Sequence, residues 1–407
     1  MLTNEVSKTK LGLFQEFVAF SFLPCVVLLT FFSLVCMPEK KDPMLVFNYF
    51  GLISGVIAFP VLIKLQDIRF FLPMLMFFMF ACLSTFWSGD VDLDLIRKVA
   101  KRSIAIIFFM LGVCAIVHTN KIEVFLKIML VVIAACAAYS MYDFYISKGR
   151  PVHWRLKSWG SLENSLHAAS MYGVFVLVGL HFLLRSNRCG IVFQGVMMLS
   201  MLLLFIGSMA TQSKGPIISL LICVFALLLI YKARKAMVTL AIVAVSVCML
   251  LYFEGDIVRS LIIRGDSHRL FIWMDAINKI KLSPWFGHGM GAQYLVEMPI
   301  LNARGEAVTF VTPHSRWLAA LFFTGVIGFL LLLYSLLCPV IKLGFYEKGV
   351  TRLMQLILFY SAMCGVTQGV GWITNPDHIW FMFWFPWAAL VALASDKKRK
   401  EKVFVPC

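Results

Sequence analysis

The chain has 407 residues, of which 61% are hydrophobic and only 14% are charged, and its mean hydropathy is +0.87. An ordinary soluble domain carries about a quarter charged residues, so this composition excludes a protein whose whole surface meets water. The net charge of +16 comes from Lys and Arg scattered over short loops. Because no basic domain or aromatic-rich basic patch gathers them, we expect no nucleic-acid partner.

Apolar runs long enough to cross a membrane follow one another almost from end to end. Crossing the hydrocarbon takes about 20 apolar residues in a helix. The runs are continuously apolar and do not alternate, which favours a helical bundle over a membrane β-barrel. We therefore expect an all-α polytopic membrane protein with about twelve transmembrane helices, the first of them uncleaved. These fall at roughly 15–36, 44–63, 70–88, 101–118, 122–141, 169–185, 190–208, 216–231, 237–253, 314–340, 353–369 and 378–394.

An even number of spans puts both termini on one side of the membrane. Basic loops alternate along the chain and include the tail Lys397–Lys400, so the positive-inside rule predicts cytoplasmic termini. The resulting organisation has four parts: nine helices within 1–253, a periplasmic loop domain at 254–313, three helices within 314–394 and a basic cytoplasmic tail at 395–407.

Three outward segments are too long to be simple connections, at about 89–100, 142–168 and 254–313. The last contains a predicted amphipathic helix that begins near Arg269 and stops at Ser283-Pro284. Its apolar residues recur at helical spacing on one face, which suits a helix lying on or under the membrane surface. They are Leu270, Trp273, Met274, Ile277 and Ile280.

His314 is the candidate general base. It lies where the long loop meets the next span, at the depth of the lipid headgroups. A neutral imidazole there can accept a proton from a hydroxyl group, because its ordinary pKa lies near the working pH. The alternative is an interfacial histidine that only hydrogen-bonds its own loop.

Three cations are candidates for binding a phosphate or diphosphate group. Arg269 opens the amphipathic helix, whose free N–H groups also favour an anion, and Arg264 lies close by in the sequence. Lys214 stands in the polar connection Thr211–Gly215 between two spans. The alternative for an arginine at a membrane surface is to extend towards the lipid headgroups.

Two further groups of cations face outward. The first, Arg97, Lys98, Lys101 and Arg102, invites an anionic partner, although Asp94 could pair with it. The second is Arg150, His153, Arg155 and Lys157. Outward cations with few paired carboxylates suit a lipid diphosphate better than carboxylate-dependent sugar hydrolysis. The cysteines lie mostly in apolar runs, and motifs for metal or nucleotide binding are lacking, so no metal or cofactor is expected.

Three stretches together resemble a known family. The stretch "ATQSKGPIISLL" is similar to a T-Q-(S/T)-R motif, "SHRLFIWMDAINKIKLSPWFGHGMG" to an R-x-x-x-(W/Y) helix followed by a P-(x)-x-G-x-G turn, and "PHSRWLAALFFTGVIG" to H-(N/S)-x-x-L…G-x-x-G. With the layout of spans, these motifs resemble the O-antigen ligase family of bacterial inner membranes, which is related to O-antigen polymerases and bacterial protein O-oligosaccharyltransferases.

The resemblance implies a GT-C-like glycosyltransferase of lipopolysaccharide biosynthesis. Such an enzyme transfers a glycan from undecaprenyl diphosphate to lipid A-core in the periplasm, without metal or nucleotide, and inverts the anomeric configuration. It implies that His314 is the base, that Arg269 binds the diphosphate, and that Lys214 stands where an arginine is usual. Lysine keeps the charge but lacks the two-pronged contact of a guanidinium.

Two alternatives stay open at the level of the sequence. A polymerase that joins one lipid-linked repeat to another would share the donor and differ only in the acceptor. A transporter or flippase for a polyisoprenoid-linked or other anionic lipid would also need outward cations. The transporter is disfavoured because the sequence has no internal repeat with broken helices in matching halves.

Overall fold

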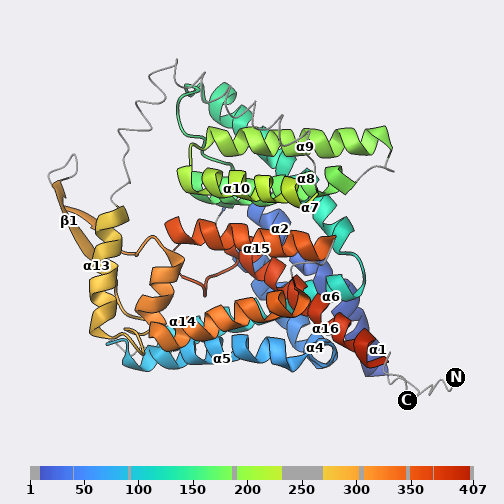
Figure 1. The fold of residues 1–407 in the computed structure, drawn as a ribbon, viewed down its shortest axis with the longest axis horizontal. Coiled ribbons are helices and arrows are strands. Elements are labelled where there is room, and N and C mark those ends of the chain that lie inside the picture. Colours follow the sequence, from blue (N-terminus) through green and yellow to red (C-terminus); the bar gives the residue numbers. More distant parts are fainter. Residues whose placement is uncertain are drawn as a thin grey trace.

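The computed structural model describes residues 10–39, 41–89, 93–185, 190–231, 269–301, 307–344, 349–369 and 371–403. Its helices run roughly side by side, while α13 and the strand β1 lie across one end of the bundle, which we call the hairpin end (Figure 1). The start of α1 and the end of α16 lie at the opposite end (Figure 1).

Nine helices within the described residues are long and apolar enough to cross a membrane, and two shorter apolar helices accompany them. The all-α fold is thereby confirmed. These eleven helices match eleven of the twelve expected spans, and the twelfth, at 237–253, lies outside the described residues. Their elements, some joined through short π-helical or 3-10 turns (η), are α1 (Lys10–Phe17), η1 (Val18–Phe22), α2 (Leu23–Cys36), α3 (Asp42–Val46), η2 (Phe47–Gly51), α4 (Leu52–Leu65), α5 (Ile68–Ser84), η3 (Thr85–Trp87), α6 (Leu93–His118), α7 (Ile122–Met141), η4 (Tyr142–Ser147), α8 (Ser165–Arg185), α9 (Ile191–Ala210), α10 (Lys214–Ile230), α14 (Arg316–Leu343), α15 (Val350–Thr367), η6 (Trp380–Trp384) and α16 (Phe385–Val403).

Two of the expected outward segments are shorter than the sequence predicted. Helix α6 begins at Leu93, so most of the segment 89–100 is helical, and its basic residues lie on the first turns of that helix. Helix α8 begins at Ser165 and η4 extends α7 to Ser147, which leaves 148–164 as the connection, with a short 3-10 turn η5 (Gly160–Leu162). Hydropathy marks only the part of a helix that lies in hydrocarbon, so it misses polar turns that extend beyond it.

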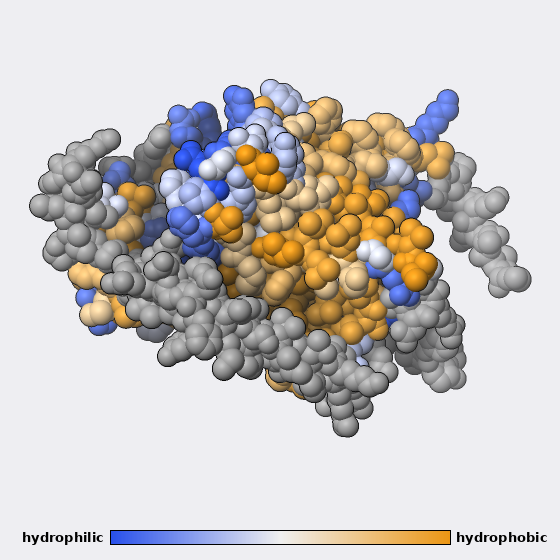
Figure 2. Space-filling view, turned by 90° about the horizontal axis from the view of Figure 1, so that it is seen from above, coloured by the Kyte–Doolittle hydropathy of each residue, from blue (hydrophilic) through white to orange (hydrophobic). Residues whose placement is uncertain are grey.

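The last helix forms the centre of the core. Trp380, Trp384 and Trp387 are fully buried. The Trp380 ring lies 5.0 Å from that of Phe47, and the Trp387 indole donates a hydrogen bond to the Ser335 carbonyl at 2.9 Å. The outer surface is apolar: one face carries a broad hydrophobic area with hydrophilic side chains towards its two ends (Figure 2).

The hairpin end contains an element that the sequence analysis did not predict. Strands β1 (Val296–Leu301) and β2 (Ala307–Phe310) pair antiparallel, with Val296 opposite Phe310. They form a small second core with α13 (Arg269–Leu282), which ends where Ser283-Pro284 predicted a stop. This helix buries Ile272 and Ala276, while most of the predicted apolar stripe is exposed, namely Leu270, Met274 and Ile277.

The turn after α13 is locked into a break in α14. At Gly325 the backbone of α14 leaves helical geometry, with φ +62°, and the helix changes direction near its start (Figure 1). The turn supplies hydrogen bonds there: His288 N and Gly289 N donate to the carbonyls of Phe322 and Phe323 at 2.7 and 2.9 Å. In return, Val326 N donates to the Pro284 carbonyl at 2.8 Å. We call this contact the interlock; it fixes α13 against α14.

Gly325→Ala should break the interlock. A Cβ there would lie 2.3 Å from the Trp285 carbonyl oxygen, and the positive φ disfavours any L side chain. We expect a loss of about 2–4 kcal/mol in the free energy of unfolding, measured by thermal unfolding in detergent. Gly195→Ala, where a Cβ meets nothing within 4 Å, is the control. Equal stability of the two variants would contradict the role of the interlock.

Candidate functional site

Several helix ends meet at the hairpin end of the bundle. Helices α10 and α14 begin there, α15 ends there, and α13 lies alongside (Figure 1). The start of α8 joins them, because the Ser213 hydroxyl donates to the Ser165 carbonyl at 3.2 Å. Helix N-termini carry a partial positive charge. Three of them meeting at one place therefore favour an anionic ligand.

His314 lies at this end, two residues before α14 begins. It is half-buried, and its ring packs edge-on against Phe310 of β2 with the centroids 5.5 Å apart. Burial lowers the pKa of His314, and the positive charge of Arg269 lowers it further. Both effects favour the neutral imidazole, which is the form that can accept a proton.

Backbone strain also gathers at this end. Among the described residues, positive φ outside glycine occurs at Asn120, Gln212 and His314, and the last two lie at the site. A non-glycine residue in this region costs about 1–3 kcal/mol and persists only where the surroundings enforce it. Ser315 follows His314 and caps α14, its hydroxyl accepting a hydrogen bond from Leu318 N at 3.4 Å. The cap and the interlock together define where the imidazole lies.

Arg269 and Lys214 each open a helix at the site. Arg269 is the first residue of α13 and acts electrostatically on His314, so the structure brings these two predicted residues together. Lys214 is the first residue of α10 and is exposed. It lies by the end of α15, because a Cβ at the neighbouring Gly215 would meet the Thr367 hydroxyl at 2.3 Å. Arg264 lies outside the described residues.

A buried group of polar side chains lies directly behind His314, and the sequence analysis missed it. The Arg316 side chain is fully buried, and its Nη2 donates to Nε2 of His378 at 3.2 Å. The His378 ring stacks on that of His167 with the centroids 3.8 Å apart. Among the described residues, no hydrogen-bond partner is found for Nε and Nη1 of Arg316. Burying a guanidinium in this way is costly, so its place two residues after His314 points to a role at the site.

The loop between α15 and α16 encloses this group. Gly369 lies so close to Arg316 that a Cβ would meet its Cγ and Nε at 2.3 Å. Burial raises the pKa of the Asp377 carboxyl to about 6, while the Arg316 charge acts in the opposite direction. The sequence offered a weak signal, the adjacent Asp377 and His378 before an aromatic run. It could not show that an arginine at the start of a span would turn inward.

The cations of α6 divide into two kinds. Lys98, Lys101 and Arg102 line one pocket of about 260 Å³, facing Thr374–Pro376 from the loop that encloses Arg316. Arg102 Nε donates to Oδ1 of Asn375 at 3.2 Å. Arg97 does not line this pocket; it is exposed and pairs with Asp94 at 3.5 Å. The structure thus gathers three of the four predicted residues.

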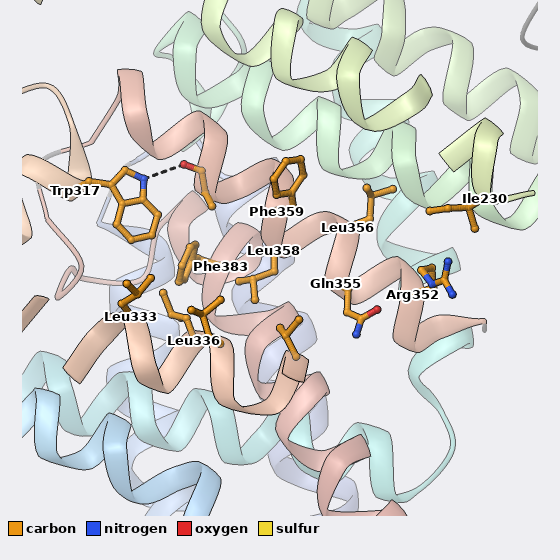
Figure 3. A pocket seen from close by; sticks show the side chains of 13 residues that line it. Ile230, Trp317, Leu333, Leu336, Arg352, Gln355, Leu356, Leu358, Phe359 and Phe383 are labelled. Carbon is orange, nitrogen blue, oxygen red and sulfur yellow. Dashed lines mark hydrogen bonds between the residues drawn. The ribbon is translucent and has the colours of Figure 1, made fainter. Parts of the chain in front are cut away.

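An apolar groove leads away from the site between α14, α15 and the end of α10. It encloses about 470 Å³ and runs from Trp317, three residues after His314, to Ile230 and Arg352 (Figure 3). The Trp317 indole donates to the Ala362 carbonyl at 3.0 Å, which fixes the ring at the near end (Figure 3). Leucine and phenylalanine side chains form most of the wall between these ends.

Comparisons with known proteins agree with this arrangement. The family model described as O-antigen ligase matches residues 199–333, a range that contains Lys214, Arg269, His314 and the interlock. An O-antigen ligase of Pseudomonas aeruginosa is 28% identical over 351 residues, which cover 83% of this chain and 82% of that protein. Both comparisons support the O-antigen ligase family.

The two comparisons support a function of the O-antigen ligase kind in general, and they suggest a glycosyltransferase-like membrane enzyme. The three sequence stretches that carried the resemblance take on a structural meaning. The glycine turn after α13 and the G-x-x-G segment of α14 are the two halves of the interlock. The T-Q-S-K stretch forms the connection from α9 into α10, and Lys214 is the first residue of α10.

Arg269→Ala should change the pH dependence of turnover. With His314 as the predicted base, its lowered pKa favours the unprotonated form, and activity should fall when the pH drops below that pKa. Removing the Arg269 charge should raise the pKa of His314, so the acid limb of kcat/KM moves to higher pH. Burial is the larger cause of the lowered pKa and remains in the variant, so the acid limb should move only part of the way towards the ordinary pKa of histidine. Arg269→Lys should keep the original limb; an unmoved limb in Arg269→Ala would show that the two residues do not interact.

Proposed function

We propose that the protein is an O-antigen ligase that transfers a glycan from undecaprenyl diphosphate to a sugar hydroxyl of lipid A-core. The observation that carries the proposal is the meeting of a half-buried His314 with Arg269 at a place where α8, α10, α13 and α14 begin. A proton acceptor beside an anion-binding surface is what transfer from a lipid diphosphate requires.

The proposed reaction is a single inverting displacement. His314 accepts the proton of the acceptor hydroxyl, whose oxygen attacks the anomeric carbon of the donor. The bond from that carbon to the diphosphate oxygen breaks, and undecaprenyl diphosphate leaves. Negative charge grows on the leaving group, so Arg269 and Lys214 stabilise the transition state more than the ground state. Arg264 is the proposed third cation. The reaction needs no metal, because these cations neutralise the diphosphate.

The apolar groove suits the isoprenoid chain of the donor. Its near end, at Trp317, is three residues from the proposed base, and its wall is almost entirely hydrocarbon. A lipid whose diphosphate lies at the hairpin end would extend its chain into the bilayer, which is the direction that the groove follows along α15 (Figure 3).

We propose that the hairpin end faces the periplasm and that both termini are cytoplasmic. The basic residues Lys64, Arg69, Arg185 and Lys342 lie near the ends of α4, α5, α8 and α14 that are opposite to the site. The positive-inside rule assigns that end to the cytoplasm. Both substrates are lipids of the inner membrane, so the site would meet them in the outer leaflet.

Reconstitution tests the proposed reaction directly. The purified protein in detergent, without an ion gradient, should attach glycan from the lipid-linked donor to lipid A-core. His314→Ala should lower kcat by about 10²–10⁴-fold, because a positioned general base contributes that much, and should leave donor affinity nearly unchanged. Product formed from donor alone would identify a polymerase, and the absence of any product would favour a transporter. Near-normal turnover by His314→Ala would exclude this mechanism.

The pocket on α6 is proposed to hold phosphates of the acceptor, since lipid A and its core carry them. Replacing Lys98, Lys101 and Arg102 together with Gln should raise the apparent KM for lipid A-core roughly tenfold, because each exposed cation contributes modestly. The residual activity should depend less on salt, with donor saturation unchanged. Arg97→Gln is the matched control, since Arg97 pairs with Asp94 outside the pocket. A change confined to donor saturation would contradict the acceptor assignment.

A further inference from the structure

A second basic pocket lies on the connection between η4 and α8. It encloses about 490 Å³ and is lined by four side chains that carry or can take a positive charge, together with two aromatic rings. We call it the loop pocket; its lining residues are Phe144, Arg150, His153, Trp154, Arg155 and Lys157. The proposed transfer assigns no role to it.

Among the described residues, those that line the loop pocket include no carboxylate. The nearest acid in sequence, Asp143, is paired with Lys148 at 2.6 Å, and Lys148 does not line the pocket. Cations this close to one another repel, and an anion held between them lowers that repulsion.

Hydrogen bonds hold the pocket in shape. Arg150 lies over the Trp154 ring, 5.2 Å from its centre, and the Tyr145 hydroxyl donates to the Trp154 carbonyl at 2.9 Å. A built pocket of this volume, with the Trp154 indole 45% exposed, offers an apolar ring surface beside fixed charges. That combination fits a sugar ring carrying an anionic group.

The loop pocket is tied to the start of α10, where the donor diphosphate is proposed to lie. Arg155 donates through Nε to the Thr211 carbonyl at 3.0 Å and through Nη2 to the Ser213 hydroxyl at 3.1 Å. The Gln212 side chain donates to the His153 carbonyl at 2.9 Å. Lys214 follows directly, so a ligand in the loop pocket lies beside the proposed reaction site.

We propose that the loop pocket binds an anionic sugar, one bearing a phosphate or a carboxylate, on a lipid-linked substrate of the reaction proposed above. The anionic sugar belongs either to the donor glycan or to the core of the acceptor. In both cases the loop pocket determines substrate selectivity, because a substrate with the charged sugar binds more tightly than the same substrate without it.

The test is a binding titration that needs no turnover. The full chain, held in nanodiscs of phosphatidylcholine, is titrated by calorimetry with two pairs of probes. The acceptor pair consists of core oligosaccharide that carries its phosphates and of the same oligosaccharide after a phosphatase has removed them. The donor pair consists of two short-chain diphosphate-linked glycans. One contains a uronic acid, and the other contains the matching neutral sugar in its place.

The variant Arg150→Gln/Lys157→Gln should raise Kd for the anionic member of one pair by about tenfold to a hundredfold, the loss expected for charge-assisted contacts. The neutral member should bind as before. Lys157→Gln alone, which keeps the contact between Arg150 and Trp154, should show a smaller loss with the same selectivity. Lys148→Gln, in the same loop but outside the pocket, should bind like the unmodified protein. The pair that responds identifies the substrate that carries the anionic sugar.

Three results would overturn the proposal: equal losses for the anionic and neutral members, the same loss in Lys148→Gln, or no loss in either pair. A fourth contradicting result could come from repeating the titration in nanodiscs that contain phosphatidylglycerol. If that lipid abolished the dependence on Arg150 and Lys157, the loop pocket would be a headgroup site for the membrane. His314→Ala should keep the binding. If the unmodified protein shows this binding but transfers no glycan, the proposed reaction is wrong and the anionic-sugar site remains.

Discussion

The interlock between the turn after α13 and the break in α14 is the contact on which the site depends. Arg269 belongs to α13 and His314 to the start of α14, and the two are 45 positions apart in the sequence. The exchange of hydrogen bonds around Gly325 fixes one helix against the other. Glycine is required on both sides, because a Cβ at Gly287 would lie 2.5 Å from Gly325 N. The interlock thus makes a single site from two separate segments.

Positive charge at the hairpin end comes from several sources with different costs. Exposed cations such as Lys214 keep much of their hydration, so they cost little and their effect is screened by salt. Arg316 is different, because it is fully buried behind His314 and bonded to an imidazole. A buried charge is expensive to keep, and Asp377 is the acid that acts on it. Together with the helix starts, these groups concentrate positive charge at the hairpin end, which suits the diphosphate of the proposed donor.

The sequence predicted the features that depend on local pattern. Long apolar runs predicted eleven of the described helices, and Ser283-Pro284 predicted the end of α13. The hairpin was missed although it left a signal: β-branched residues around Ile300 and Val308 flank a short polar stretch that contains Gly305. The pattern predicted the apolar stripe of α13 but not its second face, on which Ile272 and Ala276 pack against the protein. An apolar stripe at a membrane surface can face lipid as well as protein.

Other features depend on tertiary contacts that no sequence pattern encodes. The stacking of His167 on His378 joins residues 211 positions apart, and Arg316 turns inward to donate a hydrogen bond to His378. The sequence predicted His314 and Arg269 as site residues separately. Their electrostatic interaction depends on the folded arrangement of α13 against α14, which the sequence pattern does not give.

A double-mutant cycle tests most directly whether the interlock acts by placing Arg269. The quantity to compare is kcat/KM for Gly325→Ala, Arg269→Ala and the combined variant, with glycan transfer to lipid A-core as the assay. If Gly325→Ala acts by moving Arg269 away from the site, adding Arg269→Ala should cost little more, and the combined loss should fall well below the product of the two single losses. If the two losses simply multiply, the interlock does not place Arg269, and the site must be held together in another way.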